Sequence, residues 1–314
     1  MAPPLRSLPD ALVLSVGGVV GEAWHTGVLA GIEDAAGVDF RETEYLLGTS
    51  AGSIVAANLA AGNRPRRPDE REGPADRDGV PTDPGAAEAL ARAVLRWSVA
   101  LSGPMILRAA PLTTPSRALT RTAMLAALVL RGEETLDGLQ REIDRLGVRF
   151  DGRLRVCVSD RKNGRRTVLG SPGAPRASVA EAVTASCSIP GRFRPVRIGD
   201  REYVDGGAWS PTNLDAVPVG AGAEVLCLHA TGTLSGGLVS WAGPIVALAR
   251  ASAAVEALGL RRKGARVRVV NPDQRAAEAM GDNYMRPERR DAALLAGYQQ
   301  GRALAAGDDD PDGG

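Results

Sequence analysis

The chain has 314 residues, of which 44% are hydrophobic, 24% charged and only 4% aromatic, the composition of a globular protein with a substantial core. A formal net charge of +1 provides no global field that would attract nucleic acid. With only two histidines and three widely spaced cysteines, a His-rich or cysteine-based zinc site is excluded, and we expect no metal and no cofactor.

The cysteines and the first ten residues indicate the cellular compartment of the protein. Cys157, Cys187 and Cys227 each lie in an apolar stretch, which predicts buried free thiols in a reducing compartment. Residues 1–10 contain three prolines and no apolar run, so they do not resemble a secretory signal. The longest uncharged stretch, about 225–249, is interrupted by glycines and a proline, which predicts strand, loop and helix start instead of a membrane span. We expect a cytoplasmic protein that is either soluble or attached peripherally to the inner face of the membrane.

The first sixty residues alternate between strand and helix patterns. Ala11 to Val16 is an apolar run typical of a buried strand, and the glycine loop Gly17 to Gly21 leads from it to a helix at about Glu22 to Ala36. Tyr45 to Leu47 predicts a second strand, and Ala51 to Ala61 predicts a second helix. This order is the opening of a parallel sheet covered by helices.

Residues 63–131 interrupt the alternation. Residues 63–85 are rich in Pro, Gly, Arg and acidic residues and have no apolar periodicity, which predicts a disordered surface loop. Residues 86–131 are predicted to be helical and carry six arginines and one glutamate between apolar residues. Such a segment is typical of a lid or a membrane-facing insert, because arginines can meet anionic headgroups while apolar side chains meet acyl chains. Ordinary amphipathic helices packed on the sheet are the other interpretation.

Strand and helix patterns then continue to a solvated end. Helices are predicted at 135–146, 178–187, 244–258 and 287–306, and strands at 154–159, 167–169, 193–198, 202–204, 224–228 and 267–270. The turn Lys162-Asn163-Gly164 predicts a hairpin between the strands that flank it. Residues 307–314 are acidic and glycine-rich, which predicts a disordered tail, so one α/β domain spans residues 1–306.

The run Gly48-Thr49-Ser50-Ala51-Gly52 stands between a predicted strand and a predicted helix. In that context Gly-x-Ser-x-Gly is the nucleophile-elbow pattern, in which a sharp turn strains the serine backbone and the glycines Gly48 and Gly52 leave room for neighbouring backbone. The hydroxyl of Ser50 would then lie at a helix N-terminus, where the helix dipole favours developing negative charge. A plain tight turn is the alternative, and the strand–turn–helix context favours a nucleophile.

The glycine loop after the first strand is a candidate oxyanion hole. Acyl transfer needs hydrogen-bond donors aimed at a tetrahedral oxyanion, and the backbone N–H groups of Gly17, Gly18 and Val19 can converge without side-chain obstruction. A nucleotide-binding loop is the alternative. The pattern here is G-G-x-x-G instead of the dinucleotide fingerprint G-x-G-x-x-G, which favours the oxyanion hole.

Asp205 and His229 are the candidate bases. Asp205 ends a predicted strand and precedes two glycines, and partial burial would raise its pKa and improve it as a base. A turn aspartate that caps backbone is the structural alternative. The order Ser50, Asp205, His229 matches an α/β-hydrolase triad, so His229 is an alternative general base. His25, on the first predicted helix, is expected to pack or hydrogen-bond.

Taken together, these motifs resemble the patatin-like phospholipase family from Leu12 to about Val219. The similarity comprises the glycine loop, the elbow around Ser50, the segment Ala185 to Gly191 with the following Phe-Arg-Pro-Val, and Asp205-Gly206-Gly207. The resemblance implies a three-layer α/β/α sandwich with a mainly parallel central sheet.

The resemblance also implies a chemistry. The nucleophile and base would be a dyad of Ser50 and Asp205 without a catalytic histidine, the oxyanion hole would be Gly17, Gly18 and Val19, and the substrate would be a fatty-acyl ester of a lipid, hydrolysed through an acyl-enzyme. The family usually carries Arg or Lys where this chain has Val20. That departure leaves open a non-catalytic lipid-binding module on the same scaffold.

Overall fold

The computed structural model describes residues 4–70, 132–232 and 243–307. In chain order the strands and α-helices are β1 (Ala11–Leu14), α1 (Gly18–Ala36), β2 (Tyr45–Gly48), α2 (Ala51–Ala60), α6 (Asp137–Arg145), β3 (Leu154–Asp160), β4 (Arg166–Leu169), α7 (Val179–Cys187), β5 (Val196–Ile198), β6 (Arg201–Asp205), β7 (Glu224–Leu228), α8 (Gly243–Arg262), β8 (Arg266–Val270), α9 (Gln274–Met280) and α10 (Arg290–Ala306). Short 3-10 helices lie at Phe40–Glu42, Gly206–Ala208, Leu214–Ala216 and Pro287–Arg289.

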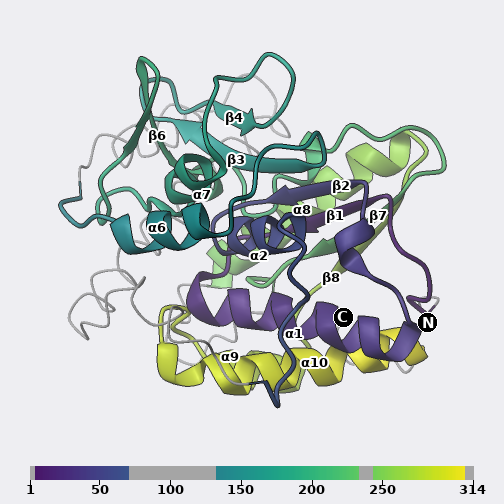
Figure 1. The fold of residues 1–314 in the computed structure, drawn as a ribbon. Coiled ribbons are helices and arrows are strands. Elements are labelled where there is room, and N and C mark those ends of the chain that lie inside the picture. Colours follow the sequence, from purple (N-terminus) through teal and green to yellow (C-terminus); the bar gives the residue numbers. More distant parts are fainter. Residues whose placement is uncertain (1–3, 71–131, 233–242, 308–314) are drawn as a thin grey trace.

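Within the described residues, the strands form one mixed sheet of eight (Figure 1). They pair in the order β5–β6–β3–β2–β1–β7–β8, and β4 pairs with β3. The pairs β3–β2, β2–β1, β1–β7 and β7–β8 are parallel, whereas β4 and β6 run antiparallel to β3, and β5 antiparallel to β6. The mainly parallel sheet and the predicted hairpin, now β3–β4, are both confirmed.

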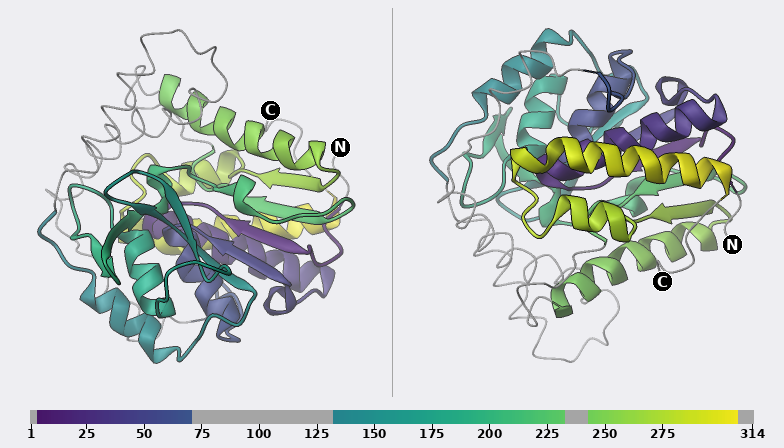
Figure 2. Two further views of the ribbon diagram at one scale, coloured as in Figure 1. Left: turned by 90° about the horizontal axis from the view of Figure 1, so that it is seen from above. Right: turned by 90° about the horizontal axis from the view of Figure 1, so that it is seen from below.

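Alternation of side chains along the buried strands creates two cores. In β1, Leu12 and Leu14 belong to the core that also contains side chains of α1, α2 and α7, while Ala11 and Val13 belong to a second core with side chains of α8. Figure 2 shows α8 on the opposite side of the sheet from α2 and α7. The predicted three-layer α/β/α sandwich is therefore confirmed.

Helices α1 and α10 approach each other at their backbones. A Cβ added at Gly31 would lie 2.1 Å from the Tyr298 carbonyl oxygen, and one added at Gly301 would lie 2.2 Å from the Val28 carbonyl oxygen. Gly27 and Gly297 are closed in the same way, since added Cβ atoms there would meet carbonyl oxygens of the facing helix at 2.2 Å and 2.6 Å. Glycine at these four positions allows α10 to lie directly on α1.

The start of the first helix and one short helix near the end of the chain differ from the sequence prediction. The first helix begins at Gly18 instead of about Glu22, so the predicted glycine loop supplies the first turn of α1. Helix α9 was not predicted; Asp273 caps it by accepting a hydrogen bond from the Ala276 N–H at 2.7 Å. Asp and Asn are preferred at this capping position because their side chains satisfy an N–H that the helix leaves free.

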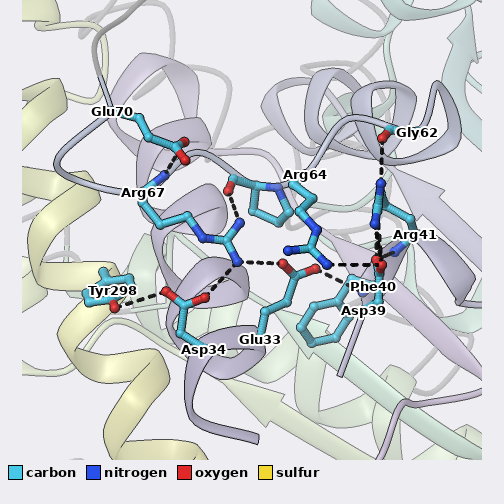
Figure 3. A network of polar contacts seen from close by, with 11 residues as sticks. Glu33, Asp34, Asp39, Phe40, Arg41, Gly62, Arg64, Arg67, Glu70 and Tyr298 are labelled. Atoms are coloured by element: carbon cyan, nitrogen blue, oxygen red, sulfur yellow. Dashed lines mark hydrogen bonds and ion pairs between the residues drawn. The ribbon is translucent and has the colours of Figure 1, made fainter. Parts of the chain in front are cut away.

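The predicted disordered loop at 63–85 begins inside the described residues. Arg67 pairs with Glu33 at 2.9 Å and with Asp34 at 2.8 Å, and the Tyr298 hydroxyl donates to Asp34 at 3.0 Å (Figure 3). These contacts join the segment after α2 to α1 and α10. Residues 71–85, the predicted helical insert at 86–131 and the tail at 308–314 lie outside the described residues.

The contact between α1 and α10 yields a stability prediction. Gly31→Ala should lower the free energy of unfolding by about 1–3 kcal/mol, because the added methyl group forces two backbones apart. The matched control is Gly259→Ala on α8, where an added Cβ meets nothing within 4 Å. There alanine should raise stability by about 0.5–1 kcal/mol. Urea denaturation measures both, and equal effects at the two sites would contradict this account.

Candidate active site

The turn between β2 and α2 has the sharp geometry of a nucleophile elbow. Ser50 has φ 52° and ψ −123°, in a region of backbone conformation that favours glycine. An added Cβ at Gly48 would lie 2.4 Å from the Ser53 Cα, and one at Gly52 would lie 2.2 Å from the Leu14 carbonyl oxygen. Both glycines are therefore required sterically, one within the turn and one against β1.

Hydrogen bonds hold the strained turn in place. The Ser50 backbone N–H donates to the Ser186 Oγ at 2.8 Å, and the Ser186 hydroxyl donates to the Cys157 carbonyl at 2.7 Å. The Ser53 hydroxyl donates to the Ser50 carbonyl at 2.6 Å. Ser186, which the sequence showed only as part of a motif, thus links the elbow to α7 and to β3.

Asp205 is brought to the elbow by the pairing of β3. Strand β4 occupies one edge of β3, because Val156 and Val158 pair with Leu169 and Thr167 there. Those two residues pair on the opposite edge with Gly48 of β2 and Asp205 of β6. Strand β6 therefore pairs with the same edge of β3 as β2 does, beyond the point where β2 turns away at the elbow. Because Val156 and Val158 are two residues apart along β3, their partners Gly48 and Asp205 are separated by roughly 7 Å.

The carboxyl group of Asp205 is buried, with 1% of the residue exposed. Burial raises its pKa to about 7, against two smaller opposing effects. The Gly207 N–H donates to Oδ1 at 2.7 Å, and the nearby Ser50 side chain also lowers the pKa, by a smaller amount than burial raises it. A buried base with a pKa near neutrality, beside a strained serine, is suited to general-base chemistry.

Cys187, at the end of α7, also lies beside Ser50. Its thiol interacts with the side chains of Ser50 and Ser53, and burial together with the charge of Asp205 raises its pKa well above the ordinary value. The prediction of buried free thiols is confirmed for Cys157 and Cys227; Cys187 is also free, and its thiol is buried although the residue as a whole is partly exposed. Its thiol is therefore a neutral neighbour of Ser50 and Asp205.

The N-terminus of α1 presents free backbone donors. The Gly21 N–H donates to the Gly17 carbonyl at 2.9 Å, and the Val20 N–H donates to the Tyr284 carbonyl at 3.2 Å. The N–H groups of Gly17, Gly18 and Val19 have no hydrogen-bond acceptor within the described part of the chain. Unpaired donors at a helix N-terminus attract negative charge.

Val20, where the family usually has a basic residue, packs into the protein. Its side chain is fully buried and belongs to the core between the sheet and α1. The segment after α9 lies against the same turn, since an added Cβ at Gly18 would lie 2.6 Å from the Tyr284 carbonyl oxygen and 2.9 Å from the Met285 sulfur. Val20 thus contributes apolar packing. An arginine or lysine at this position would have to extend its charged group out of the core to reach solvent, because burying an unpaired charge is costly.

His229 lies on the other side of the elbow from Asp205. It follows β7, and β1 stands between β7 and β2, so two strand spacings, roughly 10 Å, separate its strand from that of the elbow. Its Nε2 lies 3.2 Å from the Thr231 Oγ1. His25 is buried as predicted, with Nε2 at 3.2 Å from the Leu228 carbonyl, and burial lowers its pKa to about 3, with a smaller contribution from His229.

Three loops meet at this edge of the sheet and are bonded to one another. The Gly52 N–H donates to the Ser15 carbonyl at 3.1 Å, and the Val16 N–H donates to the Pro211 carbonyl at 3.0 Å. The Asn213 side-chain amide donates to the Thr49 Oγ1 at 3.2 Å. The elbow, the loop after β1 and the loop after Asp205 therefore form one connected unit.

Comparison with known proteins places the chain in a family. The family model for patatin-like phospholipase matches residues 12–218. The chain belongs to the patatin-like phospholipase family, which supports a lipid hydrolase activity in general. No curated protein is similar enough to match it. Among solved structures it is similar to VipD from Legionella pneumophila, with 17% identity and a TM-score of 0.46 over 96% of this chain and 67% of that one.

Two searches of the described residues returned nothing. No helix within residues 4–70, 132–232 and 243–307 is both long and apolar enough to cross a membrane. In the same ranges, no three or more His, Cys, Asp or Glu side chains are grouped so that they could hold a metal ion.

The backbone strain at Ser50 is testable by a pair of substitutions. Ser50→Gly should be more stable than Ser50→Ala by about 1–2 kcal/mol, because glycine accepts this conformation without steric cost. In the ordinary helical backbone of α8 the same pair at Ser252 should reverse sign, with alanine more stable by about 1 kcal/mol. Thermal or urea unfolding gives both differences, and a preference for alanine at Ser50 would refute the strain.

Proposed function

We propose that this protein is a lipid acyl hydrolase in which Ser50 is the nucleophile and Asp205 the base. The observation that carries the proposal is the buried Asp205 carboxyl, whose pKa is about 7 and which lies, through the pairing of β3, beside a serine on a strained elbow. Family membership supports the substrate class, a fatty-acyl ester of a lipid.

The proposed reaction has two halves. Asp205 accepts the Ser50 proton while Oγ bonds to the ester carbonyl carbon, and the tetrahedral intermediate collapses as the alcohol or lysolipid leaves with that proton. Water then gives a proton to Asp205 and attacks the acyl-enzyme, after which the fatty acid leaves and Ser50 recovers its proton. The steps are acid–base chemistry of this pair and call for no cofactor.

The N–H groups of Gly17, Gly18 and Val19 are the proposed oxyanion hole. They are unpaired among the described residues, and they follow β1, the strand next to the elbow strand. Fixed donors of this kind stabilise the charge that develops in the transition state. Because position 20 is valine instead of a basic residue, the helix dipole and these backbone donors would supply that stabilisation.

The proposed partner is the membrane surface that supplies the lipid. The basic, apolar segment at residues 86–131, outside the described residues, combines arginines for anionic headgroups with side chains suited to acyl chains. Contact would be peripheral.

Separate substitutions distinguish the dyad from its alternatives. With a short p-nitrophenyl ester, Ser50→Ala should reduce hydrolysis to background and Asp205→Asn should reduce kcat by at least about 100-fold. His229→Ala should retain most of the activity, because His229 has no part in the proposed reaction. A collapse of activity in His229→Ala would favour the triad of Ser50, Asp205 and His229.

A fluorophosphonate probe addresses the binding-module alternative. Wild-type protein should be labelled at Ser50, and Ser50→Ala should not be labelled. A wild-type protein that binds lipid vesicles yet neither reacts with the probe nor hydrolyses esters would be a lipid-binding module instead of an enzyme.

The pKa of Asp205 predicts a pH dependence. The carboxylate is the active form, so kcat/KM for an uncharged ester should rise about tenfold per pH unit up to about pH 7 and then level off. An acid limb near pH 4, as for an exposed carboxyl, would contradict the burial argument.

The same group links stability to pH with a defined sign. Its pKa in the folded protein, about 7, is above its ordinary value of 3.8, so its stabilising contribution is complete below about pH 4 and is lost as the pH rises through 7. Asp205→Asn removes this pH-dependent loss of stability, because asparagine does not ionise. Between pH 4 and 8, the variant's free energy of unfolding should therefore increase relative to wild type, as measured by urea denaturation at several pH values.

A further inference from the structure

Asn213 is a buried residue in an unusual backbone conformation behind the site. It is fully buried and has φ 51° and ψ 26°, in the left-handed region. Among the described residues, only Asn213 and Ser50 combine a positive φ with a side chain. Asparagine tolerates this conformation better than most residues, because its short amide can bond locally.

The Asn213 amide touches the chain neighbours of both Ser50 and Asp205. Its Nδ2 donates to the Thr49 Oγ1 at 3.2 Å, the Gly206 carbonyl at 3.3 Å and the Ser210 carbonyl at 2.7 Å. Thr49 precedes Ser50, and Gly206 follows Asp205. One amide group with two hydrogens therefore bridges the elbow and the turn that carries the carboxylate.

A partly buried ion pair fixes the direction in which this amide points. Arg166 donates to the Asn213 Oδ1 at 3.3 Å, so the NH₂ end faces the two loops. Arg166 also forms an ion pair with Asp215 and lies over the Trp209 ring, 5.8 Å from its centroid. The arginine is thus held on several sides, and a flipped amide would place NH₂ against a guanidinium.

The loop that carries Asn213 is itself anchored. The Ser210 Oγ accepts hydrogen bonds from the backbone N–H groups of Thr212 at 3.3 Å and Asn213 at 3.1 Å. The Glu256 carboxylate of α8 accepts the Thr212 hydroxyl at 2.6 Å and the Leu214 N–H at 2.8 Å. The amide is therefore presented by a rigid support.

We propose that Asn213 is a positioning residue that sets the separation of the Ser50 hydroxyl and the Asp205 carboxylate. This inference rests on the proposed dyad. The two groups come from different strands that both pair with β3, and Asn213 adds a direct tie between the turns at the ends of those strands, one residue from each group. A displacement of 1 Å at a reacting pair can reduce the rate by about 100-fold, so loss of the bridge should lower kcat more than substrate binding.

Asn213→Gly is the variant that isolates the amide, because glycine keeps the left-handed backbone. We expect kcat for a short p-nitrophenyl ester to fall by about 10- to 100-fold with KM within about twofold, and fluorophosphonate labelling of Ser50 to slow by a similar factor. Asn213→Ala should show the same kinetic loss and a lower melting temperature, since alanine adds backbone strain.

Gln300→Ala is the matched control for the loss of a buried amide. Gln300 accepts from the Trp24 Nε1 at 2.8 Å and donates to the Asn271 carbonyl at 2.7 Å, on α10 and away from the elbow. Its removal should lower the melting temperature and leave kcat within about twofold of wild type. A kcat loss as large as that of Asn213→Gly would show generic destabilisation and overturn the inference.

Thr49→Val tests the bridge from its other end and does not depend on whether Asn213→Gly folds. It removes the Oγ1 acceptor at nearly constant volume and should lower kcat by about 10-fold, and the double variant should be no slower than Asn213→Gly alone, because both act through one contact. An unchanged kcat in Thr49→Val, or in a folded Asn213→Gly, would overturn the inference while leaving the dyad intact. Wild-type protein that neither hydrolyses the ester nor reacts with the probe would instead refute the proposed function.

Discussion

Strand β3 pairs with two different strands along one edge, and the candidate site depends on that pairing. Strand β2 follows the first half of the edge and leaves it at Gly48, while β6 enters from the opposite direction and ends at Asp205 beside Val158. The backbone hydrogen bonds of a sheet allow little slippage, because a shift of one residue would turn every side chain to the other face. The register of β3 therefore places the elbow and the carboxylate together.

The sheet brings the two groups together, and burial sets their electrostatics. A carboxylate removed from water is costly unless it is hydrogen-bonded, and Asp205 keeps the hydrogen bond from the Gly207 N–H and a smaller favourable interaction with the Ser50 side chain. The result is a pKa near 7. Ser50 carries a second cost, its strained backbone, which the Ser186 hydroxyl and the small helix α2 help to maintain. The buried carboxylate and the strained serine backbone both lie at one edge of an otherwise regular α/β sandwich.

Most of the architecture could be predicted from periodicity, because the buried strands are short apolar runs and the helices have clear beginnings. The start of α1 at Gly18 could not be predicted in this way, because glycine is a weak helix former. It is held in the first turn by contacts with residues 284 and 285, which are distant in the chain. Helix α9 was missed because it has only seven residues. In the site, Ser50, Asp205 and the glycine loop stand in recognisable motifs, whereas Asn213 has no local signal and is identified only by the contacts that it makes.

The sequence by itself determined which residues can form the elbow and the turn after β6, because glycine requirements and strand–turn–helix order are local properties of the chain. Only the tertiary structure decided that Asp205, and not His229, lies on the line of the elbow strand, because both follow strands in the sequence and strand order depends on long-range pairing. It also decided the pKa of Asp205, since burial is produced by elements far apart in the chain. The burial of Val20 likewise depends on tertiary structure. Its side chain belongs to the core because α1 and the segment after α9, which are far apart in the chain, pack around it.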